Sequence, residues 1–109
     1  MSSLALESVV LKHPAVTQAA AFGITSAELE SEHEIMLAVV LGESMELDEA
    51  VLARYINDNA PYYFVPRYIE IMAELPLTPT QKIQKHKLRD RGLTSASWDA
   101  VSAGFEIER

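Results

Sequence analysis

Apolar residues recur at two different spacings along the chain, and these spacings predict an alternation of helices and strands. Within residues 3–13, Leu6, Val9 and Val10 stand at i, i+3 and i+4, which places them on one face of a helix. Residues 16–24 are predicted to form a strand. Residues 35–41 are an uninterrupted apolar run, which is typical of a strand buried in the middle of a sheet.

A second helix carries the clearest signals. Asp48 is a favourable N-cap, and Leu47 before it can pack against Leu52 as a hydrophobic staple. Pro61 ends the helix, because proline lacks an N–H and restricts the residue before it. The stripe expected to face the core consists of Val51, Leu52, Tyr55 and Ile56.

The remaining elements are shorter. Residues 68–72 alternate apolar and polar side chains, which predicts a third strand. Residues 83–91 predict a short helix closed by Gly92. A further short helix is expected within residues 94–104, around Trp98.

This order of elements predicts an α+β domain, with a small three-stranded sheet flanked by helices on one or both faces. The 109 residues are the length of one domain. A chain of this size buries about two thirds of the surface that it exposes when unfolded, which is enough for one modest core. Apolar residues make up 49% of the chain, which favours a folded domain over disorder.

Composition excludes several classes of function. The net charge of −7 argues against a non-specific nucleic-acid binder, which is normally basic overall. No run of about 18 apolar residues is present, so no membrane span is expected. Residues 1–20 lack the basic-then-apolar order of a signal peptide. The chain has no cysteine, which fits a reducing compartment, and we expect a cytoplasmic location.

The charges are uneven along the chain. Five of the nine basic residues lie within residues 82–91. Two interpretations stay open for them: a solvated helix face, or a surface for an anionic ligand. Nothing fixes the geometry of the acidic residues within 28–34, so no metal site is predicted.

The loop before the basic segment, residues 76–82 (PLTPTQK), is the strongest candidate for chemistry. Pro79 holds φ at about −65° and biases Thr78 toward an extended conformation, so the loop is stiff. The stiffness gives Lys82 a defined position, and a positioned ammonium can stabilise an anionic transition state. On residue type alone, a merely solvated lysine remains the commoner outcome.

Four segments, in this order, resemble the C-terminal domain of adenylate-forming enzymes. This superfamily includes acyl-CoA synthetases, the adenylation domains of nonribosomal peptide synthetases, and luciferases. Residues 3–16 resemble the family's first helix and its HPAV turn, and residues 19–24 resemble its AAVVGVPD strand. Residues 63–67 resemble its YKVPR segment, and residues 76–82 resemble the loop that carries its catalytic lysine.

The resemblance implies a lid domain and a site. Lys82 stands where the family has its adenylation lysine, which acts when a carboxylic acid and ATP form acyl-AMP, before acyl transfer to CoA. It implies that ATP, CoA and Mg²⁺ belong to the full-length enzyme and that this chain alone binds none of them. Lys85, Lys87 and Arg89 are candidates for contacts with CoA or with the N-terminal domain. Lysine acetylation is known at this motif in the family, so a lysine acetyltransferase is a further expected partner.

Residues 1–109 are therefore expected to be the C-terminal lid of an acyl-CoA ligase, inactive alone, with the large ATP-binding N-terminal domain absent from this chain. Residues 93–109 and the segment PYYFVPRYIE are most similar to the carnitine/crotonobetaine-CoA ligase branch. The alternative is a non-catalytic protein-interaction or regulatory module that retains the fold. The reading frame upstream of Met1 would discriminate between the two.

Gln81 departs from the family pattern, which has glycine before the lysine. Glycine adopts positive φ at no steric cost, whereas glutamine does so only with strain. Two outcomes stay open: the loop needs no such conformation here, or it presents Lys82 less well.

Overall fold

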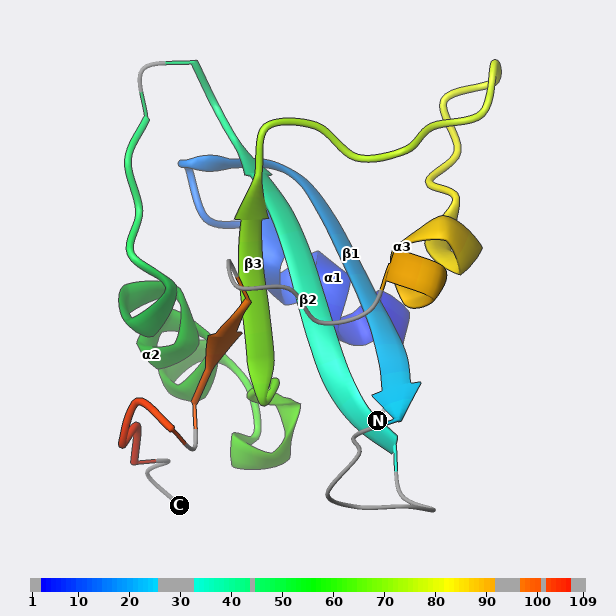
Figure 1. Ribbon diagram of the computed structural model, residues 1–109. Helices are drawn as coiled ribbons and strands as arrows, with labels where there is room; N and C mark the ends of the chain where they lie inside the picture. Colours follow the sequence, from blue (N-terminus) through cyan, green and yellow to red (C-terminus); the bar gives the residue numbers. More distant parts are fainter. Residues whose placement is uncertain (1–2, 26–32, 44, 92–96, 101, 107–109) are drawn as a thin grey trace.

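The chain folds into an α+β domain in which helices pack against a mixed sheet (Figure 1). The computed structural model describes residues 3–25, 33–43, 45–91, 97–100 and 102–106. Its elements are α1 (Ser3–Leu11), β1 (Val16–Thr25), β2 (His33–Leu41), α2 (Glu49–Asn59), the 3-10 helix η1 (Tyr62–Phe64), β3 (Tyr68–Met72), α3 (Lys85–Arg91) and β4 (Trp98–Asp99).

The sheet has four strands in the order β1-β2-β3-β4, so the prediction of three strands was wrong. Strands β1 and β2 are antiparallel, β2 and β3 are parallel, and β4 adds antiparallel to β3. Strands β2 and β3 can be parallel because α2, which lies between them in sequence, returns the chain to the end of the sheet at which β2 begins.

Strand β4 replaces the helix that was predicted around Trp98. The Asp99 carboxylate accepts a hydrogen bond from Nε of Arg67 at 3.2 Å, and the Trp98 ring packs edge-on against Phe105 at 5.9 Å. These contacts hold both residues beside β3, where Ile69 pairs with Trp98. A strand of two residues has no period that a sequence pattern can reveal. The predicted start of the helix, at residues 94–95, lies outside the described residues.

The first face of the sheet is covered by α1 and α2 and holds the larger core (Figure 1). Side chains with no exposed surface come from helices α1 and α2 and from strands β2 and β3. These side chains are Leu6, Val10, Leu37, Val39, Leu52, Ala53, Ile56 and Ile69. Strand β1 contributes the small side chains of Ala19 and Ala21 to the same cluster. The predicted burial is confirmed for Leu52 and for Val39, which lies in the apolar run of residues 35–41.

Helix α2 begins as predicted but presents a different stripe to the core. The Asp48 carboxylate accepts a hydrogen bond from the backbone N of Ala50 at 2.8 Å, which confirms the N-cap. Val51, however, is 55% exposed, so its predicted burial was wrong. Ala53 takes a buried position instead, because the helix is rotated so that Leu52 and Ala53 lie on the core side.

The second face of the sheet carries a smaller core and positions the site. It contains apolar side chains of β1, β2 and β3, covered by Leu75 from the segment after β3 and by Leu88 from α3. Helix α3 begins at Lys85, two residues later than predicted, because Ile83 is engaged in a β-bridge with Leu77. The predicted glycine cap at Gly92 lies outside the described residues.

Candidate functional site

The candidate site is a small hairpin, Leu77–Ile83, that we call the lysine hairpin. Leu77 and Ile83 form its antiparallel bridge. Inside the bridge, the backbone N of Thr78 donates to the carbonyl of Lys82 at 2.8 Å, and the N of Gln81 donates to the carbonyl of Thr78 at 2.9 Å. The loop therefore spans three residues, with Lys82 at the start of the returning arm.

The Thr78 hydroxyl closes the hairpin a second time. Its Oγ1 accepts a hydrogen bond from the backbone N of Lys82 at 3.0 Å and lies 3.0 Å from Oγ1 of Thr80. Thr78 thus holds the backbone of Lys82 through both its main chain and its side chain. Together with the fixed φ of Pro79, these bonds fix the backbone position from which the Lys82 side chain projects.

Gln81 has φ of 69°, in the left-handed region that favours glycine. In three-residue hairpin loops the last loop residue adopts this conformation, and Gln81 is that residue. The loop therefore does adopt positive φ, which excludes the first of the two outcomes that the sequence left open. Gln81 meets the requirement with strain instead of replacing it with another geometry.

The base of the hairpin is fixed to the second face of the sheet. The backbone N of Gln84 donates to the carbonyl of Pro76 at 2.8 Å, which joins the two arms below the bridge. Ile83 packs against the core cluster that contains Leu75 and Leu88. The hairpin is thus a projection from the folded body, with its tip in solvent.

Lys82 is exposed, and no described residue pairs with its amino group. A lysine ammonium offers three donors and a unit positive charge. Held on a braced loop and free of an internal partner within the described chain, it is available to a carboxylate or a phosphate oxygen of another molecule.

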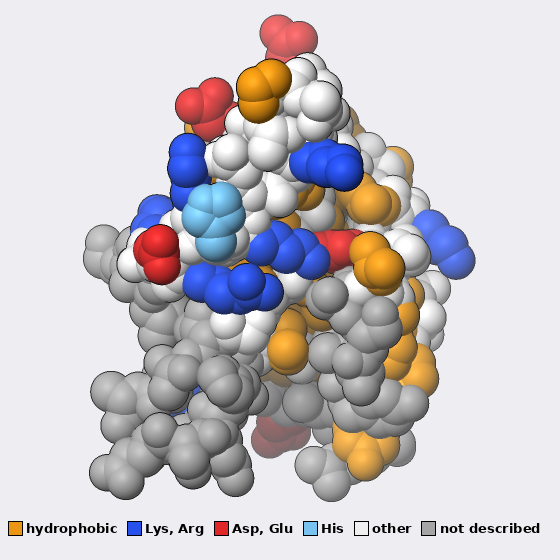
Figure 2. All heavy atoms as spheres, turned by 90° about the vertical axis from the view of Figure 1, so that its right-hand side faces the viewer, with side chains coloured by type: hydrophobic (Ala, Val, Ile, Leu, Met, Phe, Trp, Pro, Cys, Tyr) orange, Lys and Arg blue, Asp and Glu red, His pale blue; other side chains and the backbone are white. Residues whose placement is uncertain are grey.

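The basic residues that follow Lys82 divide into two sets. Lys85 pairs with Oε2 of Glu7 at 2.8 Å, and Arg91 pairs with Glu70. Lys87 and Arg89 are exposed and have no ion pair with a described residue. Figure 2 shows Lys and Arg side chains gathered on the face of the molecule that carries α3. Lys85 and Arg91 are thus paired within the domain, an outcome that neither predicted interpretation included. Lys87 and Arg89 face solvent, so both interpretations stay open for them.

The acidic side chain of the Arg91–Glu70 pair is more buried than that of the Lys85–Glu7 pair. The Glu70 side chain is 3% exposed, and Ser97 also donates a hydrogen bond to it at 3.0 Å. The hydrogen bond to Glu70 raises the pKa of Arg91, against the opposing effect of desolvation. A raised pKa contributes stability that is lost only as pH rises through it, so the titration of Arg91 adds no pH dependence near neutrality.

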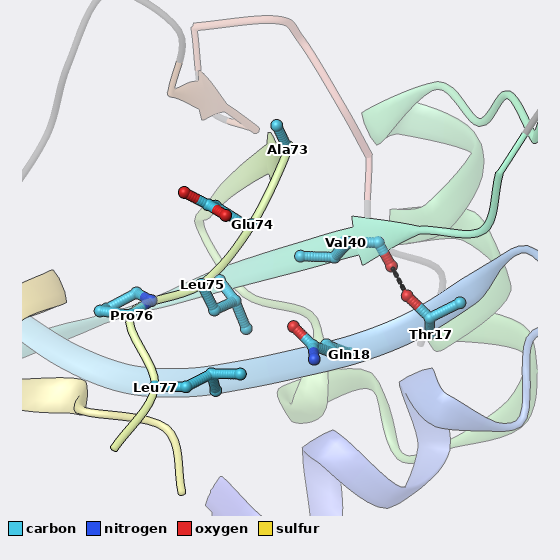
Figure 3. Close-up of a pocket in the computed structure, with 8 residues that line it drawn as sticks. All are labelled: Thr17, Gln18, Val40, Ala73, Glu74, Leu75, Pro76 and Leu77. Carbon is cyan, nitrogen blue, oxygen red and sulfur yellow. Dashed lines mark hydrogen bonds between the residues drawn. The ribbon is translucent and has the colours of Figure 1, made fainter. Parts of the chain in front are cut away.

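A pocket lies beside the base of the hairpin, where the segment after β3 crosses β1 and β2 (Figure 3). It has a volume of about 510 Å³. Its lining consists of Thr17, Gln18, Val40, Ala73, Glu74, Leu75, Pro76 and Leu77. The Thr17 hydroxyl donates a hydrogen bond to the carbonyl of Val40 at 3.1 Å. This wall of the pocket is therefore formed by the neighbouring strands β1 and β2.

Two further properties concern the described part of the chain. Within it, no group of three or more histidine, aspartate and glutamate side chains could hold a metal ion. The acidic segment of residues 28–34 falls largely outside the described ranges. No helix of the described chain is long and apolar enough to cross a membrane.

Glu7 and Glu70 are the residues that sequence reasoning missed. Glu7 stands next to Leu6 on the buried side of α1, so an acid within an apolar stripe was a usable signal. Glu70 lies between two inward-facing isoleucines, and the alternation placed it on a face with no expected partner. Its partners Arg91 and Ser97 are distant in sequence, so only the tertiary fold reveals them.

The hairpin and the sheet that supports it match a known family. Residues 5–82 match the family described as AMP-binding enzyme C-terminal domain, and the chain belongs to this family. The match covers most of the chain and ends at Lys82.

Curated relatives of the chain include CoA ligases. A mitochondrial medium-chain acyl-CoA ligase of Danio rerio is 34% identical over 79% of this chain and 14% of its own length. A probable CoA ligase of Humulus lupulus is 33% identical over 89% of this chain and 18% of its own length. The chain thus spans less than a fifth of these relatives.

Solved structures agree with this assignment. An acyl-CoA synthetase of Brucella canis superimposes with a TM-score of 0.74 at 32% identity, over 84% of this chain and 17% of that one. An amide bond synthetase of Marinactinospora thermotolerans gives a TM-score of 0.75 at 29% identity, over 84% and 18% of the two chains. The fold is therefore that of the C-terminal domains of adenylate-forming enzymes.

Proposed function

We propose that this chain is the C-terminal lid of an ATP-dependent acyl-CoA synthetase and that Lys82 supplies the cation for acyl-AMP formation. The observation that carries the proposal is the geometry of Lys82: an exposed ammonium on a hairpin braced by Thr78, without a partner in the described chain. Membership of the AMP-binding C-terminal family supports it.

The chemistry asks for such a cation. ATP, bound with Mg²⁺ in the full-length enzyme, supplies an electrophilic α-phosphate, and the acid supplies a carboxylate. A cation at about 4 Å from one of the two anions is worth about 4 kcal/mol at an effective dielectric near 20. The contribution of Lys82 is to hold this charge in place before the anions meet, so no reorganisation is needed in the transition state.

The described residues fit only part of this ligand set. They offer no acidic cluster for Mg²⁺, so the metal and most of the nucleotide would be held by the N-terminal domain of the same enzyme. Lys87 and Arg89, which face solvent, are candidates for CoA phosphates or for the domain interface. Lys85 is a weaker candidate than predicted, because Glu7 already occupies its ammonium.

The test is Lys82→Ala in the full-length enzyme, with the two half-reactions measured separately in single turnovers. Acyl-AMP formation should slow by about 10²-fold or more, through loss of a preorganised charge. CoA transfer from supplied acyl-AMP should stay nearly intact, because the resemblance to adenylate-forming enzymes implies a lid that alternates between an adenylation pose and a thioester-forming pose, and Lys82 would serve only the first. Lys12→Ala, a change at an exposed lysine of the turn after α1, serves as the control and should alter neither step. An equal loss in both half-reactions would assign Lys82 to the fold or the domain interface instead.

The acid and the regulation are finer proposals. We propose a carnitine- or crotonobetaine-like acid, which rests on the resemblance of residues 93–109 and of the segment PYYFVPRYIE. A panel of acids offered to the full-length enzyme decides it. We also propose that a lysine acetyltransferase controls the enzyme through Lys82, because acetylation of an exposed amine removes its charge. The cytoplasmic location stays a prediction.

A further inference from the structure

The carboxylate of Glu7 joins three elements of the fold. Glu7 is 9% exposed, on the side of α1 that faces the sheet. Its Oε2 accepts a hydrogen bond from the backbone N of Ala21 in β1 at 2.8 Å. The same oxygen lies 2.8 Å from Nζ of Lys85, the first residue of α3.

Glu7 is anchored to the sheet without help from Lys85. Strand β1 is an edge strand, and Ala21 would otherwise leave a buried N–H unpaired at that edge. The Glu7 carboxylate satisfies this N–H, which fixes the position of its negative charge. Lys85 therefore docks on an anion that the body of the domain already holds in place.

Helix α3 depends on such contacts. It has seven residues, too few for a stable helix by itself, and Leu88 is its buried side chain. Its first residue, Lys85, follows directly on Gln84, whose N–H closes the base of the lysine hairpin on Pro76. The ion pair of Lys85 with Glu7 consequently restrains the position of the lysine hairpin.

We propose that Glu7 and Lys85 are positioning residues, which hold the lysine hairpin in the pose that Lys82 needs. The inference rests on the proposed role of Lys82. It also assigns Lys85 to the scaffold and removes it from the candidates for CoA contact.

The first experiment follows amide hydrogen exchange in this chain and needs no activity. Glu7→Gln keeps a carbonyl oxygen for the Ala21 N–H and removes the charge that attracts Lys85. Exchange at the amides of Lys82 and Gln84 should accelerate about tenfold, the factor set by ~1.4 kcal/mol in an opening equilibrium. The amides of the central strand β2 should keep their rates.

Matched variants locate the effect. Lys85→Met should accelerate the same amides, and Lys85→Arg should restore their protection because it keeps the charge. Glu46→Gln changes the net charge equally at an exposed position and should leave every rate unchanged. Unchanged exchange at Lys82 and Gln84 in Glu7→Gln and Lys85→Met would overturn the inference. Equal acceleration in β2 would overturn it too, because the pair would then serve the whole fold.

The second experiment separates this inference from the function of Lys82. In the full-length enzyme, Glu7→Gln should slow acyl-AMP formation and spare CoA transfer from supplied acyl-AMP. Added to Lys82→Ala, it should cause no further loss, because the pair acts through that lysine. If Lys82→Ala itself has no effect, the proposed function fails while the exchange result stands. A loss confined to CoA transfer in Lys85→Met would make Lys85 a CoA contact and refute the positioning role.

Discussion

At the scale of single residues, the backbone of the lysine hairpin is decided at Gln81. Its φ of 69° compares with 75° at Gly104, where a Cβ would meet no atom within 4 Å. Gln81 therefore carries the steric cost of a left-handed backbone, about 1–2 kcal/mol, which Gly104 avoids because glycine has no Cβ. The two positions form a natural pair for measuring that cost.

Gln81→Gly should raise the free energy of unfolding by about 0.5–1 kcal/mol. Relief of the left-handed strain exceeds the extra entropy that glycine gives to the unfolded chain. Gly104→Ala should lower it by about 1–2 kcal/mol, since the added Cβ has space but the wrong backbone. Urea denaturation of both variants measures the two values. A loss of stability in Gln81→Gly would mean that the glutamine side chain makes contacts that outweigh the strain.

The roles of single residues were predictable where they depend on near neighbours. Pro79 and Thr78 lie within a few residues of Lys82, so the stiffness of its loop follows from local chemistry. The partners of Lys85 and Arg91 lie on α1 and β3, and no local pattern contains them. The charge pattern alone therefore left open which basic residues face solvent.

At the scale of elements, α2 shows how far periodicity reaches. Its cap and its end follow from Asp48 and Pro61, and Leu52 and Ile56 lie in the core as predicted. The sequence could not decide which of Val51 and Ala53 is buried, because the width of the apolar stripe depends on what packs against it. Strand β4 was beyond prediction for a related reason: it pairs with β3, and Asp99 is held by Arg67, both of which are remote in sequence.

Leu52→Ala should lower the free energy of unfolding by about 2–5 kcal/mol, through lost burial and the cavity left behind. Leu52 has no exposed surface, whereas Val51 beside it is 55% exposed. Val51→Ala is therefore the control, with an expected change within about 0.5 kcal/mol. Chemical denaturation of the two variants side by side decides the orientation of the helix. Similar losses in both would contradict it.

At the scale of the whole molecule, the two faces of the sheet serve different ends. The face under α1 and α2 holds the larger core, which supports folding (Figure 1). The other face is closed by the segment after β3 and by α3, the same elements that carry the lysine hairpin. The proposed chemistry of Lys82 therefore lies on the face with the smaller core, where α3 contributes the buried Leu88 and the ion pairs of Lys85 and Arg91.

This division predicts how the chain behaves alone. It should unfold cooperatively in denaturant, because both faces of its sheet are covered by side chains of the same chain. It should form no acyl-AMP from ATP and a carboxylic acid, because in the proposed function Lys82 is one contact of a site that otherwise belongs to an N-terminal domain. Acyl-AMP formation by the purified chain would overturn this interpretation.

Inactivity alone does not separate a catalytic lid from a non-catalytic module, so the separated domains must be recombined. If the chain is a lid, adding it to the N-terminal domain of the same enzyme should accelerate acyl-AMP formation. The Lys82→Ala chain should bind equally well and accelerate it about 10²-fold less, because it lacks only the positioned charge. Equal acceleration by both chains would show that the domain acts through its surface. That outcome would favour the interaction module and reject Lys82 as an adenylation residue.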